Sequence, residues 1–139
     1  MGEEPERYLR SCVEQGVLVL TITETKIQSD DIADALRQEM LAAVARSGIR
    51  KVVIDFRHAQ YLSSTAFRPL LSLRRKLQED GGQIILCGLS SVVGDIFYTT
   101  RMIDPSGSVK AVFDMQPDVA SAIAFLNQAP DLSPSAEQE

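Results

Sequence analysis

The stretch Lys51-Val-Val-Ile-Asp55 decides the fold. Its three apolar residues follow one another without polar alternation, which is typical of a strand covered on both faces, as in a parallel sheet. The pattern recurs at Gln83-Ile-Ile-Leu-Cys87. About thirty residues separate the two runs, enough for a helical crossover. The sequence therefore predicts two adjacent, buried, parallel strands.

Amphipathic helices are predicted on both sides of the first strand. Between the two strands, apolar residues recur at positions 66, 70, 73 and 77, polar residues occupy the opposite side, and Gly81-Gly82 ends the pattern. Before the first strand, Ser29 can cap a helix that Gly48 stops. Its apolar positions are Ile32, Leu36, Met40, Ala43 and Val44.

The remaining elements complete an α/β order. Residues 8–15 and 17–22 are β-prone runs around Gly16 and predict an antiparallel hairpin. Ser90 can cap a short helix, residues 109–113 predict a last strand, and Asp118 can cap a closing helix. The order ββαβαβαβα predicts one α/β domain over residues 8–127, with a mixed, mostly parallel sheet, an N-terminal β-hairpin and flanking helices. Residues 1–7 and 128–139 are predicted to be flexible tails.

Composition excludes several classes of protein. The chain has 139 residues and a formal net charge of −5, which argues against direct binding of nucleic acid. No apolar run is long enough to insert into a membrane, and the acidic first residues do not resemble a secretion signal, so we expect a cytoplasmic protein. Cys12 and Cys87 lack metal-ligand spacing and are interpreted as reduced core residues. No metal site or cofactor is predicted.

Three consecutive hydroxyls mark the junction after the first buried strand, in Tyr61-Leu-Ser-Ser-Thr-Ala-Phe67. Functional groups of α/β sheets gather at the carboxyl ends of strands, where loops lead into helices. Helix capping explains one hydroxyl at such a position. A phosphate is the functional alternative, because unpaired N–H groups and the helix dipole stabilise an anion there.

These segments resemble the STAS domain, named for sulphate transporters and anti-sigma factor antagonists. The resemblance rests on residues 51–56, 61–67 and 81–88 and extends by element order over about residues 8–127. It implies phosphorylation of Ser64 by a partner anti-sigma factor that is also a serine kinase. It also implies that Ser63, Thr65, Ala66 and Phe67 belong to the partner-binding surface, and that the protein is not an enzyme.

The sequence departs from the family pattern at the same turn. Ser63 replaces the usual aspartate and Ala66 the usual glycine, while residues 23–28 lack the glycine and aspartate expected before the first helix. Pro69 would interrupt a helix that began at Ser63, so the helix must start later or bend. These changes point to a different partner or a weakened interaction.

Three functions follow as hypotheses. The first is an anti-sigma factor antagonist switched by phosphorylation of Ser64. The second is a non-catalytic scaffold subunit of a stress-signalling or transporter-associated complex, which the losses of aspartate and glycine favour. The third is a hydrolase built on Asp55, His58 and Ser64, which lacks the expected nucleophile motif. A partner-facing apolar patch of Ile96, Phe97, Tyr98 and Met102 is an alternative to a core role for these residues.

Overall fold

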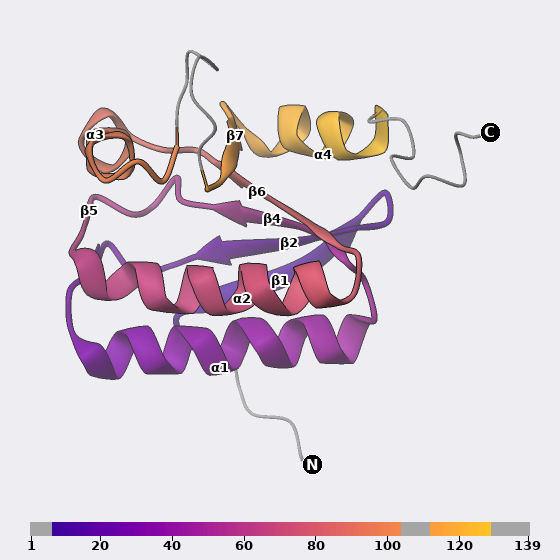
Figure 1. Ribbon diagram of the computed structural model, residues 1–139, viewed down its shortest axis with the longest axis horizontal. Helices are drawn as coiled ribbons and strands as arrows, with labels where there is room; N and C mark the ends of the chain where they lie inside the picture. The colour runs from indigo at the N-terminus through magenta and orange to yellow at the C-terminus, as the bar shows by residue number, and fades with distance from the viewer. Residues whose placement is uncertain (1–6, 104–111, 129–139) are drawn as a thin grey trace.

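The computed structural model describes residues 7–103 and 112–128. A five-stranded sheet in the order β1-β2-β4-β6-β7 forms the centre (Figure 1). Its strands are β1 (Leu9–Glu14), β2 (Val17–Ile22), β4 (Lys51–Asp55), β6 (Gln83–Cys87) and β7 (Asp114–Gln116). Strands β1 and β2 are antiparallel and the other neighbours are parallel. The predicted mixed, mostly parallel sheet with an N-terminal hairpin is confirmed.

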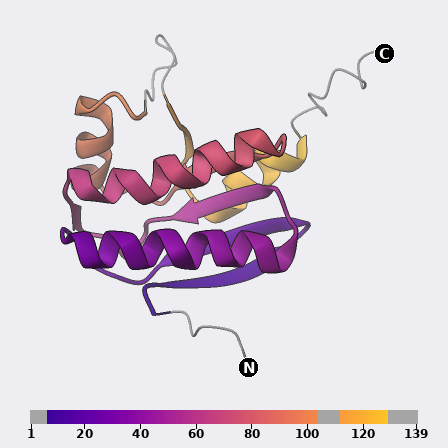
Figure 2. The ribbon, with the colours of Figure 1, turned by 60° about the horizontal axis from the view of Figure 1, so that its bottom comes forward.

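Helices cover both faces of the sheet. Helices α1 (Asp30–Ser47) and α2 (Phe67–Glu79) run side by side and in the same direction along one face (Figure 2). Helix α4 (Val119–Gln128) covers the other face, and α3 (Ser91–Thr99) lies at the end of the sheet near the start of α2 (Figure 1). Helix α1 connects β2 to β4, and α2 connects β4 to β6, and these three strands are parallel. The N-terminal ends of both helices therefore lie at the carboxyl edge of the sheet.

The central strands supply both cores. Val52 and Ile54 point into the core beneath α1 and α2, whereas Val53 points into the smaller core beneath α4. All three are fully buried, as predicted. The pairing of β4 with β6 places Val53 opposite Ile85 and Ile54 opposite Leu86. Ile84 is only half-buried, although the sequence predicts full burial for this position.

The predicted helix signals at α1 and α3 are confirmed. The Ser29 hydroxyl accepts a hydrogen bond from the Ile32 N–H at 3.2 Å, and Ser90 accepts one from Val93 at 3.1 Å. Gly48 ends α1 with φ 68°, and its N–H donates to the Val44 carbonyl. These contacts satisfy backbone groups that a helix end leaves without partners.

The last strand and one cysteine differ from prediction. Strand β7 is Asp114–Gln116 and not residues 109–113, of which 109–111 lie outside the described residues. Phe113 instead donates its N–H to the Met102 carbonyl and is buried in the main core. Cys87 is buried as predicted, but Cys12 is exposed because it lies on the edge strand β1, beyond the cover of α4. The predicted tails lie almost entirely outside the described residues, although Gln128 ends α4.

Candidate functional site

A second, two-stranded sheet joins two loops at the carboxyl edge of the main sheet. Strand β3 (Lys26–Ile27) pairs in parallel with β5 (Tyr61–Leu62). The N–H of Gln60 donates to the Thr25 carbonyl at 2.7 Å, and that of Ser63 donates to the Ile27 carbonyl at 2.9 Å. The segment before α1 and the hydroxyl-rich turn therefore form one surface, which the sequence did not predict as paired strands.

Ser64 is the hydroxyl that faces solvent in this turn. Its residue is exposed, whereas Ser63 and Thr65 are half-buried. The Oγ atom of Ser63 and the Oγ1 atom of Thr65 lie 2.8 Å apart in a hydrogen bond. The flanking hydroxyls thus satisfy each other and leave the Ser64 hydroxyl for an external partner.

The turn leads into α2 through one short 3₁₀ helix, η1 (Ser64–Ala66). Helix α2 then begins at Phe67, so Pro69 is its third residue. Proline is tolerated in the first turn because the N–H it lacks has no partner within the helix there. The later start resolves the conflict that Pro69 poses in the sequence.

The start of this helical segment has no side-chain cap. Ser63 precedes η1 and Ala66 precedes α2. Among the described residues, neither side chain makes a capping hydrogen bond. Helices α1 and α3, by contrast, are capped by serine. The N–H groups of Ala66 and Phe67 instead donate to the backbone carbonyls of Ser63 and Ser64. The positive end of the helix dipole lies close to Ser64, where it can stabilise an anion.

Ala66 and Phe67 anchor the turn from the inside. They are 3% and 7% exposed, so their side chains belong to the main core. The ring of Phe97 lies 5.3 Å from the ring of Phe67 and 5.4 Å from that of Phe56, counted between centroids. Their place on a partner-binding surface stays a prediction. In the free chain they hold Ser64 in position.

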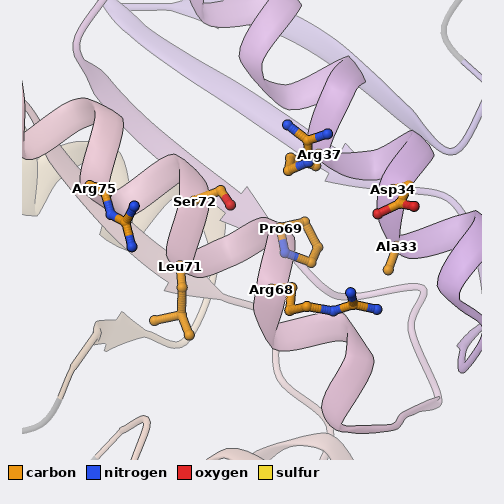
Figure 3. A pocket seen from close by; sticks show the side chains of 8 residues that line it. All are labelled: Ala33, Asp34, Arg37, Arg68, Pro69, Leu71, Ser72 and Arg75. Atoms are coloured by element: carbon orange, nitrogen blue, oxygen red, sulfur yellow. The ribbon is translucent and has the colours of Figure 1, made fainter.

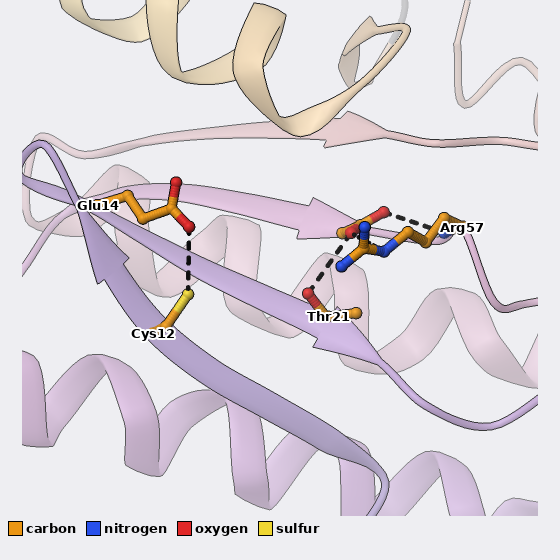
Figure 4. Close-up of polar contacts among 5 residues, drawn as sticks. Cys12, Glu14, Thr21 and Arg57 are labelled. Carbon is orange, nitrogen blue, oxygen red and sulfur yellow. Dashed lines mark hydrogen bonds and ion pairs between the residues drawn. The ribbon is translucent and has the colours of Figure 1, made fainter.

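Asp55 is the buried charge nearest this edge. Its carboxylate accepts the backbone N–H of Arg57 at 3.0 Å, lies 3.1 Å from the Arg57 Nε atom, and is 3.5 Å from the Thr21 hydroxyl (Figure 4). Asp55 is 1% exposed, and its ion pair with Arg57 offsets the cost of burying its charge. Among the described residues, exposed His58 makes no hydrogen bond or ion pair. The geometry therefore contains no Asp55–His58 pair for a hydrolytic triad.

Cys87 on β6 lies opposite Asp55 on the neighbouring strand β4. Burial, reinforced by the negative charges of Asp55 and Asp118, raises the pKa of the Cys87 thiol to about 12. The thiolate is the nucleophilic and metal-binding form. Cys87 is therefore a protonated core residue at neutral pH. Within the described residues no group of three or more histidine, cysteine or acidic side chains could hold a metal ion.

Two aromatic side chains, Tyr61 and Tyr98, are exposed, whereas Phe97 is buried. Tyr61 on β5 is 41% exposed and Tyr98 on α3 is 56% exposed. Phe97 is buried in the core, and Ile96 and Met102 are half-buried against it. The four-residue apolar patch is therefore reduced to Tyr98 with partial contributions from two neighbours. Exposed Tyr61 was missed in the sequence, where its only signal was its place two residues before the hydroxyl cluster.

The fold and this turn define a domain class. The sequence matches the STAS domain family over residues 8–122, so the chain belongs to that family. It is 34% identical over 65 residues to BtrV of Bordetella bronchiseptica, which carries the name anti-sigma factor antagonist. That alignment covers 47% of this chain and 55% of BtrV, about half the length of each.

Solved structures have the same fold. An anti-sigma factor antagonist from Thermotoga maritima has a TM-score of 0.71 at 11% identity, covering 86% of this chain and 94% of the other. The phosphorylated form of SpoIIAA, a Bacillus cell-fate determinant, has a TM-score of 0.60 at 15% identity, covering 85% and 98%. Among the helices that the structure describes, none has the length and apolar character to cross a membrane.

Proposed function

We propose that this chain is a phosphorylation-regulated protein-binding module that acts as an anti-sigma factor antagonist in the cytoplasm. It binds a kinase-type anti-sigma factor through the surface around Ser64 and releases it when Ser64 is phosphorylated. The observation that carries the proposal is the exposure of Ser64 at a helical start without a side-chain cap. The names of BtrV and of phosphorylated SpoIIAA support it.

The local geometry is compatible with both forms of Ser64. A phosphate would add about −1.5 to −2 charges. Near the start of η1 and α2 the helix dipole favours that charge by about 0.3–1 kcal/mol. The fold holds the turn through the Ser63–Thr65 hydrogen bond and through buried Phe67, none of which involves the Ser64 hydroxyl. The disruptive effect of the phosphate therefore falls on the docked partner.

A partner has a continuous surface to contact. Exposed Lys26 on β3 and Tyr61 on β5 are paired with each other, and Tyr61 precedes Ser64 by three residues. Tyrosine is enriched in interfaces because its ring buries a large area and its hydroxyl keeps a polar contact. Ser63 and Thr65, both half-buried, form the rim of this surface. Ala66 and Phe67 contribute to binding indirectly, because their buried side chains fix the backbone of the Ser64 turn.

A scaffold role without a switch is the second candidate. It is favoured by the residue at the start of η1, where Ser63 uses its hydroxyl on Thr65 instead of offering a carboxylate. A scaffold would bind its partner equally well with and without ATP. Both candidates act by binding, and we propose no catalytic activity for either.

Phosphorylation and binding can be measured together. The purified chain is incubated with a candidate kinase partner from neighbouring genes and ATP, and the phosphorylated residue is located by mass spectrometry. We expect phosphate on Ser64 and its absence from Ser64→Ala. Ser64→Asp should weaken partner binding, while Ala124→Glu, which adds the same charge on an exposed position of α4, should not. Phosphate confined to other residues, with Ser64→Asp binding normally, contradicts the switch.

A further inference from the structure

A hollow of about 320 Å³ opens between α1 and α2 on the outer side of these helices (Figure 3). Ala33, Asp34 and Arg37 contribute from α1. The wall from α2 consists of Arg68, Pro69, Leu71, Ser72 and Arg75. Positions 68, 72 and 75 recur at helical spacing, so they share one face of α2. The sequence places Arg68, Ser72 and Arg75 on the polar side of a helix.

The lining of this hollow, called the groove below, carries more positive than negative side chains, whereas the chain as a whole is negatively charged. The lining holds three arginines, Arg37, Arg68 and Arg75, and one carboxylate, Asp34, in a protein with a net charge of −5. Arg68 is also paired at the rim with Asp30, whose Oδ1 atom lies 2.5 Å from its Nη2 atom. Within the described residues, the side chains of Arg37 and Arg75 make no hydrogen bond or ion pair. Two guanidinium groups are therefore available to an anion.

The lining also has an apolar component. Leu71 is 36% exposed, and Ala33 and Pro69 lie buried beneath the opening. Guanidinium groups bind carboxylates and phosphates through paired N–H donors, and the apolar wall suits the aliphatic stem of an acidic side chain. A glutamate side chain supplies both parts. A bare inorganic anion would leave the apolar wall unused.

The groove lies at the same end of the molecule as the Ser64 turn. Arg68 follows Ser64 by four residues, and α1 and α2 begin at the same edge of the sheet (Figure 2). A protein docked on Ser64 can therefore extend a segment over α1 and α2. The groove has arginines on both walls, half-buried Arg37 on α1 and exposed Arg68 and Arg75 on α2, which suits a chain segment lying along the helices.

We propose that this groove binds an acidic, glutamate-containing segment of the protein partner, with Arg37 and Arg75 as its principal charged contacts and Ser72 as a further donor. The proposal rests on the proposed function in taking the segment from the protein that docks at Ser64. Arg68 closes the end of the groove next to the turn and remains held by Asp30.

A peptide assay tests the groove without the partner. Binding of fluorescein-labelled hexaglutamate is followed by anisotropy at low ionic strength, with inorganic phosphate as a competitor. We expect the double variant Arg37→Gln/Arg75→Gln to bind about tenfold more weakly. The control Arg10→Gln/Lys51→Gln removes the same charge from β1 and from the start of β4 and should bind like the unchanged chain. Circular dichroism verifies that each variant folds.

Three results would overturn the proposal: no binding of hexaglutamate to the unchanged chain, equal weakening in both double variants, or competition by inorganic phosphate as strong as that by unlabelled peptide. The first two exclude a specific site, and the third indicates a site for small anions. The assay contains no kinase and no phosphorylated serine. Its failure therefore leaves the proposed role of Ser64 standing, and absence of Ser64 phosphorylation leaves the peptide result unchanged.

Discussion

The hydroxyls of Ser63 and Thr65 lie 2.8 Å apart and close a hydrogen bond across Ser64. Each of the two residues is half-buried, whereas the residue between them is exposed. The turn is therefore held by its outer members and presents its middle member. This arrangement separates the two residues that stabilise the turn from Ser64, the proposed phosphoacceptor.

Alanine substitutions should reveal that separation in the free energy of unfolding. Ser63→Ala removes a partly buried hydrogen bond and should cost about 0.5–1.5 kcal/mol. Ser64→Ala removes an exposed hydroxyl and should change stability by less than about 0.5 kcal/mol. Urea denaturation measures both. A larger loss for Ser64→Ala than for Ser63→Ala would mean that Ser64 is a structural residue.

Restoring a carboxylate beside Ser64 should stabilise the fold. In Ser63→Asp the new side chain meets helix N–H groups that no side chain caps, and Thr65 can still donate to it. A negative charge at a helix start contributes about 0.3–1 kcal/mol, and salt screens it. We expect a higher melting temperature whose gain shrinks with added salt. Ser63→Asn, which caps without charge, is the control, and a gain independent of salt would exclude the dipole as its cause.

Gly81 and Gly88 both have a positive φ angle, but substitution by alanine should destabilise the protein to different extents. Gly81 has φ +76° and open space around it, whereas a Cβ on Gly88, at φ +71°, would lie 2.6 Å from Asp55 Oδ1 and 3.0 Å from the Arg57 nitrogen. Gly81→Ala should cost about 1–2 kcal/mol from the left-handed conformation alone. Gly88→Ala adds a clash with a buried carboxylate and should cost clearly more. Equal losses in chemical denaturation would show that the Asp55–Arg57 pair moves aside freely.

The loss of stability on truncating an apolar side chain of β4 or β6 should increase with the burial of that side chain. Ile54 is 0% exposed and packs in the main core, so Ile54→Ala should cost about 2–5 kcal/mol. Ile84→Ala should cost less, since this residue is half-buried. Denaturant midpoints at unchanged slope report the difference. The reverse order would contradict the burial of these two strands.

The elements that the sequence predicted are those with a repeated pattern. Val52-Val53-Ile54 identifies a central strand because three successive apolar residues need cover on both faces. Ser29, Gly48 and Ser90 mark helix ends because capping is local chemistry. The two-residue strands β3 and β5 escaped prediction because two residues carry no period, and their pairing depends on how α1 and β4 bring the loops together. Strand β7 was displaced for a similar reason: its three residues, Asp-Met-Gln, are too few to show a period, and its position follows from the free edge of β6.

The site was predictable to a similar extent. The exposed position of Ser64 follows from turning a helix so that Phe67 and Leu70 are buried, which the pattern of α2 dictates. The Arg37–Arg75 groove did not follow, because the contact between two helices is set by packing and has no local signature. Cys12 illustrates the same limit, since an apolar sequence context does not reveal that a strand lies at the edge.

Alkaline pH should destabilise the protein through Cys87. Its pKa is raised from 9.0 to about 12 in the folded chain by burial and by the charges of Asp55 and Asp118. Below the unfolded value the thiol is protonated in both states, and its contribution to stability is complete. Between pH 9.0 and about 12 only the unfolded chain loses the proton, so stability falls as pH rises, by at most about 1.4 kcal/mol per pH unit.

The contribution of Cys87 can be separated from those of other alkaline groups by comparing the unchanged chain with Cys87→Ala in chemical denaturation across this range. The variant should begin less stable, because a buried side chain is truncated, and should lose less stability with rising pH. Cys12→Ala is the matched control: Cys12 is exposed on β1, its pKa is raised less than that of Cys87, and its substitution should change the slope of the unchanged chain less than Cys87→Ala does. Parallel pH profiles for all three proteins would mean that Cys87 ionises in the folded state as readily as in the unfolded chain, in conflict with its burial behind Asp55.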